Sequence, residues 1–188
     1  IAIKLFADDK NLPDLQENIK VGQWFVVNGD AQFDPFSKDL SILAKGIRKT
    51  TVTEKMDNAP EKRVELHLHT QMSQMDAITP VKDLIERAAK WGHPAIAITD
   101  HGVVQAYPDA YSTAKKAGIK VLYGVEIYLL GEEIHKADGK LDYKNCDFYH
   151  AILLVKNQTG LKNLYKLISE SHLDYFYKTP RVPKSLLA

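Results

Sequence analysis

Short apolar strands alternate with amphipathic helices from about residue 63 onward, and this alternation constrains the fold more strongly than any other feature of the sequence. Apolar runs predict strands over 64–68, 95–98, 121–128 and 148–155. Helical periodicity predicts helices over about 80–91, 108–117 and 160–171. Strands that alternate with helices are typical of an α/β layer with parallel strands. We therefore expect an α/β fold class for this part of the chain.

Local capping signals mark where the helices should begin and end. Thr79 is expected to cap the first helix, with Pro80 in its first turn, and Thr159 is expected to cap the last one. Gly92 and Gly118 follow two of the helices, where glycine readily ends a helix in the left-handed conformation.

The first 56 residues differ in character and predict mainly β-structure. Strands are expected over about 1–5, 21–27 and 40–47, with a short helix within 8–17. Asn28-Gly29 is a strong signal for a tight turn. The polar stretch around Pro60 predicts a linker, so we expect domains over 1–56 and 63–188 joined by residues 57–62.

Bulk properties narrow the protein class. The chain has 188 residues and a net charge of +1, which neither favours nor excludes a nucleic-acid partner. Its single cysteine, Cys146, cannot form an internal disulfide, so we expect a cytoplasmic protein. No segment is long and apolar enough to suggest a membrane span or a signal peptide. The chain starts at Ile1 inside an expected strand, so we expect it to be a piece of a longer protein.

The first predicted strand of the α/β part ends in His67-Leu68-His69. Residues two apart on a strand point to the same face, so both imidazoles are expected to project together. Two such nitrogens suit a borderline metal such as Zn or Mn. Asp76 follows in the next loop and can bring a carboxylate back to the pair.

The next strands add further candidate ligands. His101 ends the second strand, with Asp100 beside it as a second-sphere support, and Glu126 ends the third. Parallel strands bring their carboxyl ends to one side, where α/β folds place their sites. His150 lies near the start of the fourth strand, so its position in the cluster is less well supported.

A single histidine is more often a surface or hydrogen-bonded core residue than a metal ligand. Several consecutive strand ends that each supply His, Asp or Glu are much less expected by chance. The set as a whole therefore predicts a multinuclear metal site for phosphoester chemistry, while His93, His135 and His172 are not assigned to it.

At these residues a family resemblance becomes visible. The segments 65–76, 98–102 and 124–126 resemble the successive motifs of the polymerase and histidinol phosphatase (PHP) domain. With 149–154 and 160–164, the match is similar to the PolC-type alpha subunits of bacterial DNA polymerase III. The β-rich segment before residue 57 resembles the OB domain that precedes the PHP domain in that family.

The resemblance implies a fold and a cofactor. It implies a partial, distorted TIM-like barrel, preceded by a small OB-type β-barrel that we expect to lack its N-terminal strands. The implied centre holds up to three divalent ions, and active relatives hydrolyse phosphoesters with water that the metal ions activate. The implied metal ligands are His67, His69, Asp76, His101, Glu126 and His150.

Two departures from the family pattern limit what the chain itself can do. PolC-type enzymes carry a proofreading exonuclease inserted within the PHP domain, whereas here only residues 129–147 fill that position, without an acidic exonuclease motif. The remaining family ligands and the polymerase active site are not in this sequence, so the PHP domain is incomplete and no catalytic residue is assigned. Mg-dependent polymerisation and contacts with the sliding clamp would belong to the parent enzyme.

OB folds bind single strands with basic grooves and stacking aromatic residues. Lys45, Arg48, Lys49 and Trp24 are the candidates here for contact with template DNA. The alternative is that Trp24 belongs to the core and that the basic side chains are merely solvated.

Three functions remain open from the sequence. The leading hypothesis is a fragment of a replicative DNA polymerase, which acts together with the rest of that enzyme. The second is a free-standing, metal-dependent PHP phosphoesterase. The third is a non-catalytic module that binds nucleic acid, whose affinity would fall steeply with salt.

Overall fold

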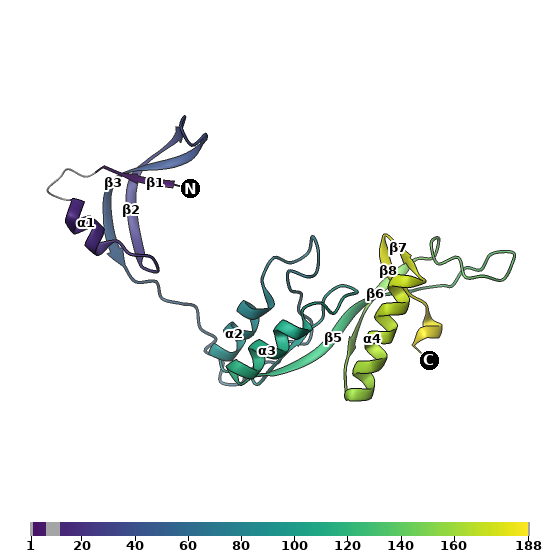
Figure 1. Ribbon diagram of the computed structural model, residues 1–188. Coiled ribbons are helices and arrows are strands. Elements are labelled where there is room, and N and C mark those ends of the chain that lie inside the picture. Colours follow the sequence, from purple (N-terminus) through teal and green to yellow (C-terminus); the bar gives the residue numbers. More distant parts are fainter. Residues whose placement is uncertain (1, 7–11, 188) are drawn as a thin grey trace. The chain divides into compact units, whose positions relative to one another are not determined.

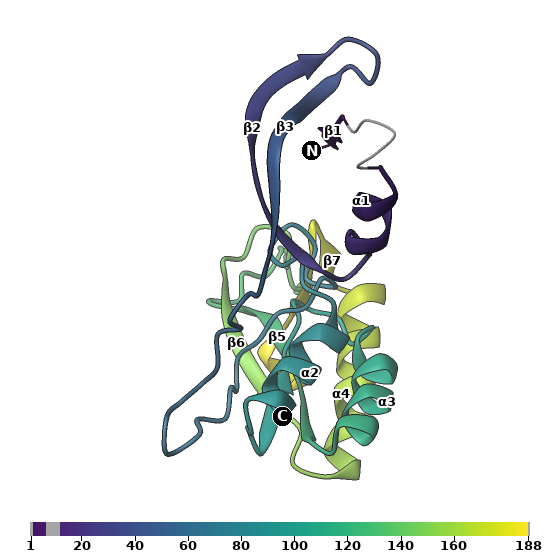
Figure 2. The same ribbon diagram turned by 90° about the vertical axis from the view of Figure 1, so that its left-hand side faces the viewer.

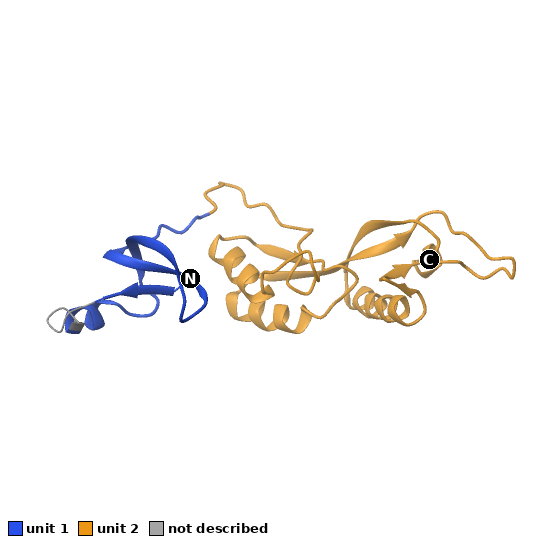
Figure 3. Ribbon diagram, turned by 90° about the horizontal axis from the view of Figure 1, so that it is seen from above, with its two compact units in different colours: residues 1–56 blue, residues 57–188 orange. Residues whose placement is uncertain are grey.

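The computed structural model describes residues 2–6 and 12–187. The chain divides into two compact units, Ile1–Met56 and Asp57–Ala188, coloured separately in Figure 3. Each unit is described by itself below.

The first unit is a three-stranded sheet in the order β1-β3-β2. Its elements are β1 (Ala2–Leu5), α1 (Leu12–Asn18), β2 (Trp24–Asp34) and β3 (Asp39–Thr50). β1 runs parallel to β3, and β2 and β3 form the long curved hairpin seen in Figure 2. The three expected strands are confirmed, and residues 8–11 of the expected helix lie outside the described part. The described residues form an open sheet, so the OB barrel stays a prediction.

The tight turn expected at Asn28-Gly29 is wrong. β2 continues through this dipeptide to Asp34, and the pairing with β3 shifts register there as a β-bulge. A Cβ on Gly29 would lie 2.1 Å from the carbonyl oxygen of Leu43, so glycine serves a close backbone approach here. The chain instead turns at residues 35–38, where the Asp34 carboxylate accepts hydrogen bonds from two backbone N–H groups.

The second unit combines a five-stranded sheet with three α-helices (Figure 1). Its elements are α2 (Val81–Lys90), β4 (Ala95–Ile98), α3 (Tyr107–Ala117), β5 (Lys120–Leu130), β6 (Phe148–Leu154), α4 (Gln158–Leu173), β7 (Phe176–Tyr177), β8 (Thr179–Val182) and a short 3-10 helix (Lys184–Leu186). The strand order is β4-β5-β8-β7, and β6 pairs with β5. The α/β class is confirmed, whereas the partial TIM-like barrel stays a prediction because the described strands form an open sheet.

The expectation that all these strands are parallel is wrong for β6. β4 and β8 run parallel to β5, but β6 runs antiparallel to it. A parallel return would need a crossover, which is usually a helix. Residues 131–147 contain no helix, and the N–H of Gly131 donates to the carbonyl of Asp147 at 2.9 Å, so the chain returns directly alongside β5.

The strand expected over 64–68 is reduced to one bridge, between Glu65 and Ile96. The segment does lie beside β4, because the N–H of Thr99 donates to the Leu68 carbonyl at 2.9 Å. The N–H of Leu68, however, donates to the Thr99 hydroxyl at 2.8 Å. The Thr99 side chain thus takes the place of a backbone acceptor, and the regular hydrogen bonding between the two segments ends here.

Both expected threonine caps are wrong. α2 starts after Pro80, which makes no side-chain cap, so Thr79 lies one residue too early. α4 starts two residues earlier than expected, at an extended Asn157 whose side chain accepts the N–H of Gly160 at 2.9 Å. Thr159 therefore lies inside the first turn of α4.

Residues 57–62, which were expected to form a linker, are part of the second unit. Oδ2 of Asp57 lies 3.0 Å from Nε2 of His93 and 3.5 Å from Nζ of Lys62. His93 Nδ1 also donates to the carbonyl of Arg63 at 2.8 Å, which gives this histidine a structural role.

Apolar side chains from the three helices and from β4, β5 and β8 form one core. On β5, Val125 and Ile127 are fully buried in this core. Glu126 lies between them and therefore points to the opposite face of the strand. Burial of its two neighbours fixes the direction of the Glu126 carboxylate. No helix in the described part of the chain has the length and apolar character needed to cross a membrane.

Candidate metal centre

Residues from four places in the second unit converge on one cluster. His67, His69 and Asp76 come from the loop before α2, His101 follows β4, Glu126 lies on β5 and His150 on β6. These are the six candidate ligands that the sequence indicated, and the structure brings all of them together.

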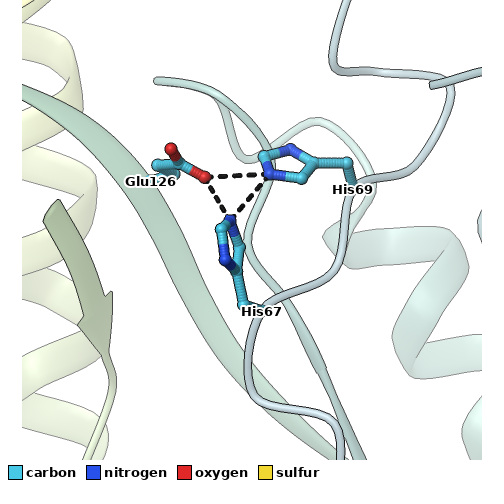
Figure 4. Close-up of side chains that lie close together, drawn as sticks. All are labelled: His67, His69 and Glu126. Carbon is cyan, nitrogen blue, oxygen red and sulfur yellow. Dashed lines mark hydrogen bonds and ion pairs between the residues drawn. The ribbon is translucent and has the colours of Figure 1, made fainter. Parts of the chain in front are cut away.

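The first group joins the two loop histidines to Glu126, as Figure 4 shows. Nε2 of His67 lies 2.9 Å from Nε2 of His69. Oε2 of Glu126 lies 2.9 Å from Nε2 of His69 and also contacts Nε2 of His67. Three potential ligand atoms from two segments thus face one another.

Two further groups share residues with the first. Oδ2 of Asp76 lies 3.2 Å from Nε2 of His101 and 3.7 Å from Nδ1 of His69. Oε1 of Glu126 contacts Nδ1 of His150 and lies 3.8 Å from Nδ1 of His101. Within each group of three residues the ligand atoms lie within 4.8 Å of one another. The two oxygens of Glu126 thus face different histidines, which is how a bridging carboxylate is arranged.

The antiparallel direction of β6 explains why His150 joins the cluster. In the β5–β6 pair, Tyr128 lies opposite His150 and Glu126 lies opposite Ile152. The start of β6 therefore lies beside the carboxyl end of β5. On a parallel strand, His150 would have been at the far end of the sheet.

A buried hydrogen-bond network supports the ligands from behind. The Asp100 carboxylate accepts the N–H of Thr70 at 2.6 Å, its hydroxyl at 2.8 Å and the Ser73 hydroxyl at 2.7 Å. The Ser73 oxygen accepts the N–H of His101 at 3.1 Å and lies 2.8 Å from Nδ1 of His69. Ser73 gives its one proton to Asp100, so Nδ1 of His69 must be the donor in that contact. His69 therefore turns an unprotonated Nε2 toward the centre.

The donor set fits a divalent cation. The unprotonated Nε2 of His69 lies 2.9 Å from a Glu126 carboxylate oxygen, and both atoms are hydrogen-bond acceptors. Because neither atom carries a proton to share, a cation is needed to stabilise their approach. Nδ1 of His101 is buried and has no hydrogen-bond partner among the described residues. Imidazole nitrogens and carboxylate oxygens together are ligands that Zn²⁺ and Mn²⁺ accept.

The protonation states of the ligands also favour cation binding. Burial raises the pKa of Glu126, but hydrogen bonds from His67 and His150 outweigh it, so the pKa lies below that of an ordinary glutamate. Burial lowers the pKa of His101, and the neighbouring His69 shifts it in the same direction. Both shifts favour an anionic carboxylate and a neutral imidazole, the states that bind a metal.

The sequence interpretation missed the roles of two residues near the centre. The sequence assigned no role to Ser73, because its contact with Asp100 depends on the folded chain. The Tyr128 ring stacks on His101 at 5.7 Å between ring centroids and meets the His150 ring edge-on at 5.1 Å. Tyr128 follows Glu126 by two residues on β5. The alternation of side chains along a strand could therefore have indicated that Tyr128 lies on the same face as Glu126.

The four candidate DNA-binding residues of the first unit do not share one face. Trp24, which is 62% exposed, pairs with Thr50 on β3, so it lies on the same face as Arg48, two residues away. Lys49 pairs with Phe25 and lies on the other face, whereas Lys45 is the unpaired residue of the β-bulge, with Nζ 2.7 Å from an Asp30 carboxylate oxygen.

Residues 65–188 match the family model of the PHP domain. The chain belongs to the PHP domain family. The PHP match contains all six candidate ligands, so the cluster lies within the part of the chain that defines the family.

Sequence comparison points to one class of PHP-containing protein. The chain is 57% identical over 129 residues to the PolC-type DNA polymerase III of Clostridium perfringens, which covers 69% of this chain and 9% of the relative. It is 49% identical over 172 residues to the PolC-type DNA polymerase III of Bacillus subtilis, which covers 90% of this chain and 12% of the relative. The chain thus spans about a tenth of the length of these curated relatives.

Among solved structures, part of the chain has a weak similarity to an amidohydrolase from Chromobacterium violaceum with bound sulfate. The identity is 23% and the TM-score 0.39, and the match covers 57% of this chain and 34% of that one. A likeness of this degree carries no argument about function.

Proposed function

We propose that this chain is part of a replicative DNA polymerase of the PolC type, and that its PHP unit holds up to three divalent ions, Zn²⁺ or Mn²⁺. The observation that carries the metal proposal is the convergence of four histidines and two carboxylates in three overlapping groups. The polymerase proposal is supported by identities of 57% and 49% to PolC-type DNA polymerase III.

We assign the six ligands mainly a role in organising the unit. They come from the loop before α2 and from the ends of separate strands, so ions bound there would link these segments. Ions in such a site neutralise charge on phosphoryl oxygens and activate water. Glu126 holds histidines on both sides, and Asp100 with Ser73 keeps His69 in the tautomer that presents Nε2.

Thermal unfolding with and without a chelator tests the organising role. Ligand binding stabilises a folded state by about 2.7 kcal/mol when the free ion is 100-fold above its Kd. We therefore expect the chelator to lower the melting temperature, and His69→Ala to remove most of this sensitivity. His135→Ala is the matched control, because His135 lies in the 131–147 loop and outside the cluster. A melting temperature that ignores the chelator would contradict the role.

We further propose that the first unit is an OB domain that contacts single-stranded template DNA. Its exposed basic and aromatic side chains, Lys45, Arg48, Lys49 and Trp24, support this. Mg²⁺-dependent synthesis and contact with a sliding clamp would belong to the rest of the polymerase. Affinity for a single strand should fall as the salt concentration rises. Each phosphate contact should add about −0.7 to the slope of log K against log salt concentration. Affinity that is independent of salt would contradict this.

A free-standing phosphoesterase is not favoured. The alignment with the B. subtilis polymerase covers 172 residues, more than the PHP match at 65–188 contains, so it includes part of the first unit. Whether the metal centre also hydrolyses phosphoesters can be tested on the full-length protein, with His101→Ala as the variant that should abolish such activity.

A further inference from the structure

A second cluster, rich in cations and aromatic rings, lies in the PHP unit outside the six ligands. Its centre is Tyr177, at the end of β7, with a side chain that is 37% exposed. Nζ of Lys178 lies 5.6 Å, Nζ of Lys144 5.9 Å and Cζ of Arg181 5.3 Å from the centroid of its ring. Three positive charges therefore surround one partly exposed ring.

The three cations are not equivalent. Arg181 is buried, and its guanidinium donates to the carbonyls of Tyr143 at 2.5 Å and Cys146 at 2.8 Å. Lys144 and Lys178 are exposed, and neither forms an ion pair with a carboxylate of the described residues. Arg181 thus fixes the 131–147 loop, and the two lysines remain available for an anion.

The backbone at Lys178 gives an independent indication. Lys178 connects β7 to β8 with φ of +61°, in the left-handed region that glycine adopts without cost. A non-glycine residue there carries about 1–2 kcal/mol of strain. Strained positions of this kind tend to occur where a side chain serves a function. Glycine would suit the turn without strain, so Lys178→Gly would remove the charge without disturbing the backbone.

The neighbouring residue Phe176 points to the opposite face of β7, and its contacts connect this strand to the metal centre. Phe176, which is 50% exposed, stacks on His172 at 5.9 Å between centroids. Nε2 of His172 donates to the carbonyl of Gly102 at 2.9 Å, directly after the ligand His101. The partly exposed Tyr177 ring, flanked by two lysines that form no ion pair, matches a strand whose bases can stack and whose phosphates are negative.

We propose that β7, Lys178 and Lys144 form a platform that binds a single strand of nucleic acid beside the PHP metal centre. Stacking on Tyr177 tolerates any base, and the two lysines contact phosphates. A flat apolar protein partner would not need two unpaired cations at the ring. The platform includes none of the six metal ligands, so its test is independent of the metal proposal.

Fluorescence anisotropy with a labelled oligothymidylate and the whole chain tests the platform, with a chelator present to exclude phosphates held through a metal ion. Tyr177→Leu should weaken binding roughly 5- to 150-fold, the range reported for loss of one base stack, and Tyr177→Phe should not. Lys144→Ala/Lys178→Ala should reduce the slope of log K against log salt by about 1.4. Lys115→Ala/Lys116→Ala removes two exposed charges from α3 and is the matched control.

The first unit could also bind the oligonucleotide, so location must be measured. Photo-crosslinking with 5-iododeoxyuridine, followed by peptide mass spectrometry, should label residues 175–178. Lys178→Gly should keep or raise the melting temperature while lowering affinity, because it removes both strain and charge. Crosslinks confined to residues 1–56, or an unchanged salt slope in the double-lysine variant, would overturn the platform. Absence of any binding would also overturn it, and would leave a protein partner as the alternative occupant.

Discussion

Replacing Ser73 by alanine removes a single oxygen that connects three parts of the metal centre. The Ser73 side chain is fully buried, and its oxygen contacts His69, Asp100 and the N–H of His101 at 2.8, 2.7 and 3.1 Å. Each hydrogen bond contributes about 1 kcal/mol net, so we expect a loss of about 3 kcal/mol in the free energy of unfolding.

The more specific effect should be on metal affinity. Without Ser73, Nδ1 of His69 loses its hydrogen-bond acceptor and keeps only the Asp76 carboxylate at 3.7 Å, so Nε2 is less firmly held unprotonated toward Glu126. Loss of such an outer hydrogen bond typically lowers metal affinity 10- to 100-fold. Competition with a chromophoric chelator measures this affinity, and urea denaturation of the metal-free protein measures the stability.

A matched control separates the two effects. Ser169→Ala also removes a hydroxyl, which donates to the Tyr165 carbonyl at 2.9 Å on the exposed side of α4. We expect this variant to change stability by less than about 0.5 kcal/mol and metal affinity not at all. If Ser73→Ala bound metal as tightly as the parent chain, the tautomer argument for His69 would be refuted.

Three further perturbations test other parts of the account. Gly102→Ala should destabilise the unit by at least about 1–2 kcal/mol in urea denaturation and weaken metal binding at His101, because φ is +60° there and a Cβ would lie 2.5 Å from Cγ of Pro180. Arg181→Lys should cost about 3 kcal/mol and speed limited proteolysis within 131–147, because an ammonium cannot reach two carbonyls with the geometry of a guanidinium. Acidification through about pH 6.5 should release the ions, because protons compete for imidazole nitrogens. Burial lowers the pKa of His101, so this ligand should take up its proton below the usual range of a histidine, and equilibrium dialysis across the pH range would detect the release. Unchanged proteolysis, stability or metal content in these experiments would contradict the corresponding contact.

The elements with strong local signals were predictable from the sequence. β4 covers 95–98 as expected, and α3 ends at Gly118, which adopts the left-handed conformation with φ of +70°. Both features depend on hydrophobic periodicity and on glycine, which act over a few residues.

Features that depend on pairing between distant segments were not predictable in the same way. Asn28-Gly29 has the composition of a turn, yet the close approach of Leu43 makes it a bulge inside a long strand. The direction of β6 follows from the path of residues 131–147, which no local pattern describes. β7 and β8 are short, and their apolar pattern is too brief to indicate a strand.

The same distinction between local signals and distant contacts applies to the residues of the metal centre. The six candidate ligands were found because strand ends and loops place His, Asp and Glu at regular intervals in the sequence. Their second-sphere network was only partly found, because Ser73 and Asp100 meet across a separation of 27 residues. The position of His150 was underestimated for the same reason, since it depends on the antiparallel pairing with β5.

Metal content tests the central claim most directly. The chain would be dialysed against Zn²⁺ or Mn²⁺, passed through a desalting column and analysed by inductively coupled plasma mass spectrometry. The three overlapping ligand groups predict more than one ion per chain and loss of most of it in a His67→Ala/His69→Ala/His101→Ala variant. A parent chain that retained no more metal than this variant would contradict the claim that these residues form a metal centre.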